Sequence, residues 1–136
     1  MAGNFEANKS RLPWPVERGA ITGRFGKQKH PVLQHVEIDN KGIYIQTTSG
    51  SNARCVFDGV VSSVFSVPGS NNTVIVKHGN YRTVYANLTT LYVKTGDSVK
   101  TKQNLGKIFV DEDKTELYFQ LYKNFDLQNP EAWLTK

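Results

Sequence analysis

The feature that most limits the fold of this chain is a series of short runs rich in Val, Ile, Tyr and Phe, each closed by a turn signal. β-Branched and aromatic residues favour strands, and Gly, Pro, Asn and Asp favour the turns between strands. The runs are residues 43–45, 54–57, 60–65, 73–77, 81–85, 105–110 and 116–122. Asp58-Gly59 predicts a hairpin between two of these runs. Helical signals are confined to residues 88–91 and 129–134, so we expect an all-β domain.

Alternation along the runs assigns their side chains to faces, because neighbouring strand residues point to opposite sides of a sheet. In residues 116–122 the odd positions are apolar, and we expect them to face the core. In residues 43–45 the two isoleucines are expected to point inward and Tyr44 to point away. In the run that begins at Tyr81, Tyr85 and Asn87 are expected to share one face.

Length and charge limit the classes of protein that remain. The 136 residues suffice for one domain, and we expect residues 1–11 to be a linker remnant and residues 12–136 to be the domain. The formal net charge is +5, but the basic residues are scattered, which disfavours nucleic-acid binding. No apolar run approaches the roughly 18 residues of a membrane-spanning helix, and the first residues lack a signal-peptide pattern. The single Cys55 is expected to be buried and unreactive.

Several short motifs occur in an order that resembles the lysostaphin-type (LytM-like) zinc peptidases of the bacterial envelope. Each motif is weak alone, but the order is specific and spans nearly the whole chain. The motifs are Ile21-Thr22-Gly23-Arg24-Phe25-Gly26, Val56-Phe57-Asp58-Gly59, Val74-Ile75-Val76-Lys77-His78-Gly79, Tyr85-Ala86-Asn87-Leu88, Val93-Lys94-Thr95-Gly96-Asp97 and Glu116-Leu117-Tyr118-Phe119-Gln120. The resemblance implies twisted antiparallel β-sheets of the duplicated hybrid motif type, with an open groove.

The zinc-binding elements of that family are altered here. Active members hold zinc with a His-x-Gly-x-Asp element and the second His of a late His-x-His. The first His of that pair and the His of a Tyr-x-His-Leu element assist the attacking water. The matching positions carry Asn40 and Tyr44, then Glu116 and Tyr118, and then Asn87. An amide is a poor zinc ligand, and a phenol is protonated at neutral pH. We therefore expect no metal, no cofactor and no catalysis.

Relatives that have lost these ligands include the EnvC- and NlpD-like activators of cell-wall amidases. The resemblance implies a non-catalytic domain in the bacterial envelope or periplasm, which binds and activates an amidase through its vestigial active-site groove. Aromatic side chains flanked by polar groups suit such binding. The groove residues expected from the sequence are Asn40, Tyr44, Tyr85, Asn87, Glu116, Tyr118 and Gln120.

Alternative functions remain open at this stage. In one alternative, the groove side chains merely fill the former metal pocket and pack on one another. In another, the groove binds peptidoglycan itself, which the positive charge favours. A third is a cell-wall endopeptidase whose metal site has been rebuilt from His30, His35, Glu37 and Asp39, although their spacing matches no zinc pattern. His78 is expected to be a turn residue rather than a catalyst.

Overall fold

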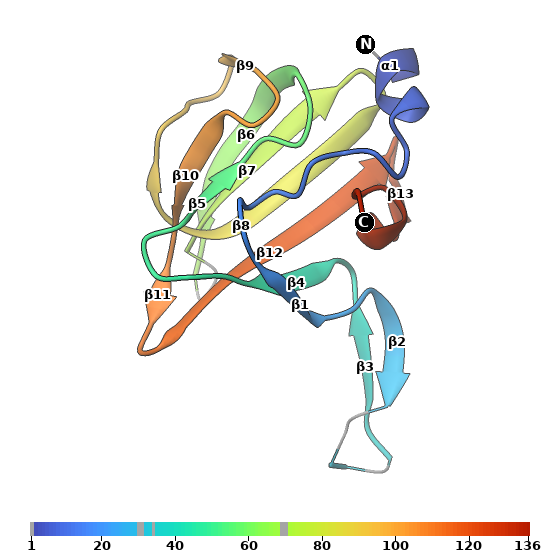
Figure 1. The fold of residues 1–136 in the computed structure, drawn as a ribbon, viewed down its shortest axis with the longest axis vertical. Coiled ribbons are helices and arrows are strands. Elements are labelled where there is room, and N and C mark those ends of the chain that lie inside the picture. Colours follow the sequence, from blue (N-terminus) through green and yellow to red (C-terminus); the bar gives the residue numbers. More distant parts are fainter. Residues whose placement is uncertain (1, 30–31, 34, 69–70) are drawn as a thin grey trace.

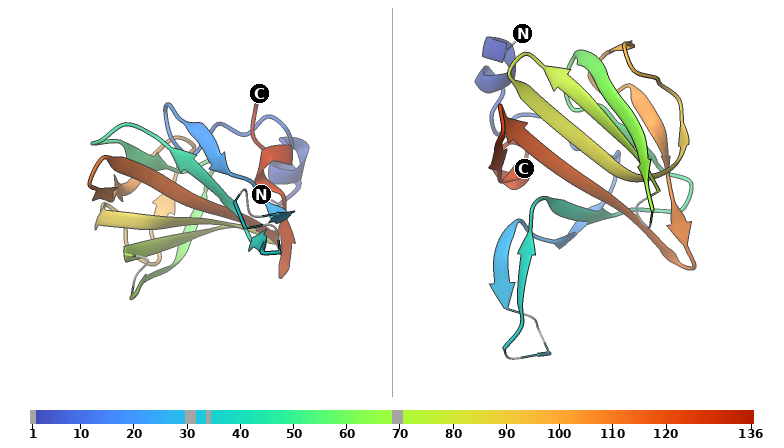
Figure 2. Two further views of the ribbon diagram at one scale, coloured as in Figure 1. Left: turned by 90° about the horizontal axis from the view of Figure 1, so that it is seen from below. Right: turned by 180° about the vertical axis from the view of Figure 1, so that it is seen from behind.

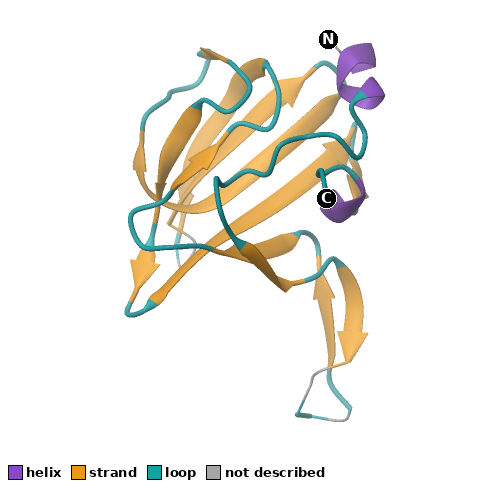
Figure 3. Ribbon diagram, viewed as in Figure 1, coloured by secondary structure: helices purple, strands orange, loops and turns teal. Residues whose placement is uncertain are grey.

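The computed structural model describes residues 2–29, 32–33, 35–68 and 71–136 as a β protein with two short helical segments (Figures 1 and 3). The helical segments are α1 (Ala2–Ala7) and the 3-10 helix η1 (Pro130–Ala132), which Asn129 caps. The strands are β1 (Ala20–Gly23), β2 (Gly26–Lys29), β3 (Glu37–Asn40), β4 (Ile43–Gln46), β5 (Asn52–Arg54), β6 (Gly59–Val67), β7 (Asn71–His78), β8 (Tyr81–Leu91), β9 (Ser98–Val99), β10 (Asn104–Ile108), β11 (Val110–Asp111), β12 (Lys114–Lys123) and β13 (Asp126–Gln128). The all-β prediction is confirmed.

The strands pair antiparallel in the order β1-β4-β12-β8-β7-β6-β9. The far end of β8 leaves this main sheet to pair with β10, which in turn pairs with β5. In Figure 1, β5 and β10 lie in front of the main sheet, and the view from behind in Figure 2 shows β7, β8 and β12 with nothing in front of them. The main sheet therefore has one covered face and one open face.

The core fills the space between the two layers. Leu117, Phe119 and Leu121 of β12 are fully buried, as are Ile43 and Ile45 of β4, so the predicted faces of these strands are confirmed. Full burial of an aliphatic or Phe side chain contributes about 1.5–3 kcal/mol. Alternation then forces the intervening residues of both strands onto the open face.

Two local predictions were wrong. Residues 88–91 continue β8 rather than forming a helical turn, because they pair with the sequence-distant strand β10. The run around Arg54 does not form a hairpin with β6 either, since β5 pairs with β10 and β6 pairs with β7 and β9. The Asp58 carboxylate instead accepts hydrogen bonds from the backbone N–H and the hydroxyl of Thr101, at 2.7 and 2.8 Å.

The N-terminal segment, which we expected to be a linker, packs on the domain. Phe5 of α1 is fully buried, and its ring lies 4.9 Å from His78, 4.7 Å from Tyr81 and 5.3 Å from Trp133 between centroids. The prediction that His78 lies in a turn was wrong. It ends β7 as a buried residue, and its ring nitrogens contact the Asp58 carbonyl at 2.8 Å and the Thr83 hydroxyl at 2.9 Å.

The hairpin of β2 and β3 extends away from the rest of the molecule (Figures 1 and 2). It carries three of the four residues considered for a rebuilt metal site. His35, Glu37 and Asp39 are exposed, and His30 lies outside the described residues. Among the described residues no helix is long and apolar enough to cross a membrane.

Candidate functional site

Two tyrosines lie side by side on the open face. Tyr44 of β4 and Tyr118 of β12 are directly opposite each other in the ladder, and their ring centroids are 4.7 Å apart. The Gln120 side-chain amide donates a hydrogen bond to the Tyr118 hydroxyl at 3.0 Å. Each of the three side chains is half-buried, so each presents area to solvent. The structure thus brings these three predicted residues together.

Asn87 reaches the same face by a route that alternation missed. It has a φ of 74° and sits in a bulge, where the β7–β8 register shifts between Asn72 and Thr73. An extra residue of this kind reverses which face the following side chains occupy. Asn87 donates to the backbone carbonyl of Glu116 at 2.7 Å and accepts from the Asn71 amide at 2.8 Å. Its expected position beside Tyr85 was therefore wrong, but its contact with β12 places it at the site.

The remaining polar positions join this cluster at its edge. The Glu116 carboxylate accepts from the Thr22 hydroxyl at 2.6 Å and lies 3.7 Å from the Lys114 ammonium. Asn40 ends β3 and donates its amide N–H to the Arg24 carbonyl at 2.9 Å. These hydrogen bonds orient both groups toward the protein rather than toward a common point.

Tyr85 was assigned to the groove from the sequence, and this prediction was wrong. Its side chain is fully buried in the core on the other face of β8, where its ring lies 5.3 Å from that of Phe119. The hydroxyl oxygen accepts hydrogen bonds from the Val56 N–H at 3.1 Å and from Thr83 at 2.9 Å. Burial raises the pKa of Tyr85 well above its ordinary value, so this phenol stays neutral.

The side chains at the positions that the sequence resemblance assigns to the zinc ligands do not fit zinc. Zinc sites use imidazole, thiolate or carboxylate groups that converge on the ion. Asn40 donates its amide N–H to the Arg24 carbonyl, while the rings of Tyr44 and Tyr118 pack against each other with their planes tilted by 40°. Burial raises the pKa of Tyr118, which keeps this phenol protonated. Across the described residues, no three His, Cys, Asp or Glu side chains are grouped closely enough to hold a metal ion.

The open face continues from the tyrosines into an apolar pocket of about 350 Å³. Ile75 of β7 and Val84 of β8 are cross-strand neighbours and form its floor. Phe65 of β6 and Phe125, in the turn before β13, form its walls with 42% and 88% of their areas exposed. Gln120 lines the pocket and also bonds Tyr118, so pocket and tyrosine pair form one surface. We call this surface the open-face groove.

The Phe125 wall is held by a cation. The Arg82 guanidinium lies 5.6 Å from the centroid of the Phe125 ring and donates to the Asn124 carbonyl at 3.2 Å. Asn124 has a φ of 56°, which Asn tolerates better than most residues do. The groove therefore has an apolar floor, aromatic walls and a positive charge at one end.

Sequence reasoning missed the whole apolar pocket. Phe65, Ile75, Val84 and Phe125 come from four segments, and strand pairing brings them together. One signal was available, because Phe125 stands between Asn124 and Asp126 in a polar turn, where a large apolar residue has no core to reach. Isolated exposed apolar residues are common, but a contiguous patch marks a binding site.

Comparison with known proteins gives a consistent assignment. Peptidase family M23 matches residues 38–130. The murein hydrolase activator EnvC of Escherichia coli is 26% identical over 135 residues, which is 97% of this chain and 31% of EnvC. The peptidoglycan DD-endopeptidase ShyB of Vibrio cholerae is 33% identical over 107 residues, which is 76% of this chain and 25% of ShyB.

Among solved structures, Csd3 of Helicobacter pylori superposes with a TM-score of 0.77 and 28% identity, over 92% of this chain and 35% of Csd3. The chain spans about a third or less of each of these proteins. The expected lysostaphin-type fold, with its large antiparallel sheet, is confirmed. From the match over most of its length, this chain belongs to Peptidase family M23.

Proposed function

We propose that this domain is a non-catalytic regulator of peptidoglycan hydrolysis in the bacterial envelope, which binds and activates a cell-wall amidase through the open-face groove. The observation that carries the proposal is the packed pair Tyr44–Tyr118, two residues that the sequence resemblance assigns to zinc-ligand positions, on a surface that continues into an apolar pocket. The similarity to a murein hydrolase activator over 97% of the chain supports it.

The composition of the groove supports protein binding rather than small-molecule chemistry. Binding hot spots consist of aromatic and Arg side chains near the centre of an interface, surrounded by groups that exclude water. Here Phe65 and Phe125 expose apolar area beside Arg82, while Gln120 and Asn87 supply hydrogen-bonding groups around the tyrosines. A partner that inserts an apolar side chain between the two phenylalanines would remove that area from water.

The proposal is tested by activation of a purified, autoinhibited cell-wall amidase, followed as release of dye-labelled murein fragments. We expect Phe125→Ser to reduce both activation and amidase affinity at least tenfold, since truncation of a hot-spot residue costs about 2 kcal/mol or more. Its matched control is Tyr92→Ser, which removes another exposed aromatic side chain outside the groove. Equal activation by Phe125→Ser and the unaltered chain would contradict the proposal.

Direct binding of peptidoglycan by the same groove is the second candidate, and the net charge of +5 favours an anionic wall polymer. Co-sedimentation with purified murein sacculi, at low and at moderate salt, separates the two candidates. Under our proposal the chain stays in the supernatant at moderate salt unless the amidase is present. Pelleting without the amidase, abolished by Phe125→Ser, would favour the second candidate.

The similarity to an endopeptidase calls for a separate assay of peptide-bond cleavage. We expect no release of muropeptides from purified peptidoglycan with or without added zinc. Zinc-dependent release at a rate proportional to the concentration of the chain would overturn the non-catalytic part of the proposal.

A further inference from the structure

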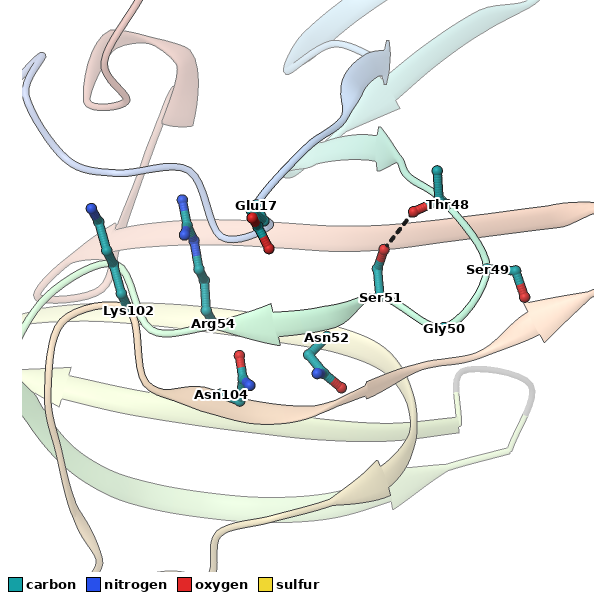
Figure 4. A pocket seen from close by; sticks show the side chains of 9 residues that line it. All are labelled: Glu17, Thr48, Ser49, Gly50, Ser51, Asn52, Arg54, Lys102 and Asn104. Atoms are coloured by element: carbon teal, nitrogen blue, oxygen red, sulfur yellow. Dashed lines mark hydrogen bonds between the residues drawn. The ribbon is translucent and has the colours of Figure 1, made fainter.

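A second pocket, of about 420 Å³, lies away from the groove, on the layer that covers the other face of the main sheet (Figure 4). Its volume falls within the range of about 300–1,000 Å³ that is usual for ligand sites. Unlike the groove it has no aromatic wall, and every residue around it except Gly50 has a polar or charged side chain. These residues are Glu17, Thr48, Ser49, Gly50, Ser51, Asn52, Arg54, Lys102 and Asn104.

One side of the pocket is positively charged. Arg54 of β5 is directly opposite Asn104 of β10, and its Nε donates to the Trp14 carbonyl at 3.0 Å. This bond fixes the guanidinium group, and among the described residues no further partner engages its two terminal nitrogens. Lys102, in the turn before β10, extends in the same direction as Arg54 (Figure 4). A fixed guanidinium beside an ammonium group is a good receptor for a carboxylate.

The loop before β1 adds a negative charge. Glu17 lines the same pocket, but in the described residues its carboxylate forms no ion pair, since the acidic groups that do so are Glu131, Glu116 and Glu6. Two cations and one carboxylate thus line the same pocket without forming an ion pair with each other. A ligand that carries both an ammonium and a carboxylate would satisfy both sets, whereas an acidic sugar or a phosphate would engage the two cations but leave Glu17 without a partner.

The rest of the lining suits amide groups. The Asn52 side-chain oxygen accepts from the Tyr92 hydroxyl at 2.8 Å, which leaves its NH₂ group available to donate. Asn104 presents both an amide donor and an amide acceptor, and the Thr48 and Ser51 hydroxyls bond each other at 2.9 Å on the opposite wall. Peptide bonds need this mixture of donors and acceptors.

We propose that this pocket binds a short peptide with free ends, with its terminal carboxylate on Arg54 and Lys102 and its ammonium group on Glu17. The inference is independent of the proposed function, because the groove and this pocket lie on opposite faces. Either one can fail while the other stands.

The test is an NMR titration of the isotopically labelled chain with tri-alanine, its N-acetyl form and its C-terminal amide. Tri-alanine should shift the backbone amide signals of residues 48–52 and 102–104. N-acetylation should weaken binding about fivefold, as expected for loss of one exposed ion pair. Amidation of the carboxylate should weaken it about tenfold, because two cations then lose their partner.

Charge-neutralising variants test which pocket residues bind the ammonium end and which bind the carboxylate end of the peptide. Glu17→Gln should bind tri-alanine about fivefold more weakly and abolish its preference over the N-acetyl form. Lys102→Gln should reduce the preference over the C-terminal amide, and Lys94→Gln, an exposed lysine outside the pocket, should change nothing. The proposal is overturned if tri-alanine shifts none of these signals at millimolar concentration. It is equally overturned if both blocked forms, or glucuronate, bind as tightly as tri-alanine.

Discussion

Two tyrosines on neighbouring strands have opposite surroundings. Tyr85 of β8 is opposite Phe119 of β12, and both rings are fully buried in the core. Tyr118, one residue before Phe119, is opposite Ala86 and lies half-buried on the open face against Tyr44. A shift of one position along a strand therefore separates a residue that stabilises the fold from one that is available to a partner.

The two sides of the main sheet also differ in how completely their polar atoms are hydrogen-bonded and their apolar side chains are buried. Among the described residues, no buried side-chain nitrogen or oxygen lacks a hydrogen-bond partner, and Tyr85, Thr83 and His78 form one chain of such bonds. The open side keeps Phe65 and Phe125 in contact with water. Covering apolar area lowers the free energy of the system. The core side has already done so and specifies the fold, whereas the open side still has apolar area that a partner can cover.

The largest effect is expected on the core side. Tyr85→Ala should lower the free energy of unfolding by about 3–5 kcal/mol through the cavity that it leaves. Tyr85→Phe should cost about 1–3 kcal/mol, because the buried Val56 N–H loses its acceptor. Urea denaturation measures both. If Tyr85→Ala were as stable as the unaltered chain but no longer activated the amidase, Tyr85 would belong to the groove after all.

Phe5 tests whether the N-terminal segment belongs to the core. We expect Phe5→Ala to lower the free energy of unfolding by about 3 kcal/mol, since its ring packs on Tyr81 and Trp133. Its neighbour Glu6 is exposed, and Glu6→Gln should stay within about 0.5 kcal/mol of the unaltered chain. Equal stability of the two variants in urea would restore the expectation of a linker.

His78 should make the core side sensitive to acid. Burial lowers the pKa of His78 from 6.5 to about 4 in the folded chain, so as the pH falls the unfolded chain takes up the proton first. The contribution of neutral His78 to stability is complete above pH 6.5 and is lost between pH 6.5 and pH 4. The loss amounts to roughly 3 kcal/mol. Urea unfolding between pH 7 and pH 4 should show a shallower pH dependence for His78→Gln; identical slopes would exclude His78 as the cause.

The matching change on the open side should affect stability less. Tyr118→Ala removes a half-buried ring and should cost about 1 kcal/mol in urea denaturation. The same variant should bind the amidase at least tenfold more weakly, since it removes an aromatic anchor. A loss of 3 kcal/mol or more with unaltered amidase affinity would make Tyr118 a core residue that only fills the former metal pocket.

Zinc should have the smallest effect. A metal that binds only the folded chain raises its melting temperature, and we expect no shift in saturating zinc and no metal retained after dialysis. Stoichiometric retention would contradict this. Loss of the retained metal in His35→Ala would then assign the site to the β2–β3 hairpin.

The parts of this structure that follow from local rules were predictable. Leu117 and Phe119 could be placed in the core, and Tyr118 on the other face, from alternation alone. Alternation does not say which face of a strand is covered, however, and for this reason Tyr85 was misassigned. It also fails at a bulge, which is how Asn87 reached the open face.

Contacts between distant segments were beyond the sequence. Nothing near Phe5 forms a periodic pattern, and its burial depends on Trp133 at the other end of the chain. The apolar pocket likewise exists only because pairing of β6, β7 and β8 aligns Phe65 and Ile75 with Val84. Strand order depends on tertiary packing, which a single sequence does not reveal.

The central claim is that the open face, and not the core face, contacts the amidase. Methyl-labelled chain titrated with the purified amidase tests it directly, because β7 carries Ile75 toward the groove and Val74 and Val76 toward the core. We expect the methyl signals of Ile75 and Val84 to shift or broaden while those of Val74 and Val76 stay in place. Perturbation confined to methyl groups of the covering layer, or none at an amidase concentration that gives full activation, would contradict the claim.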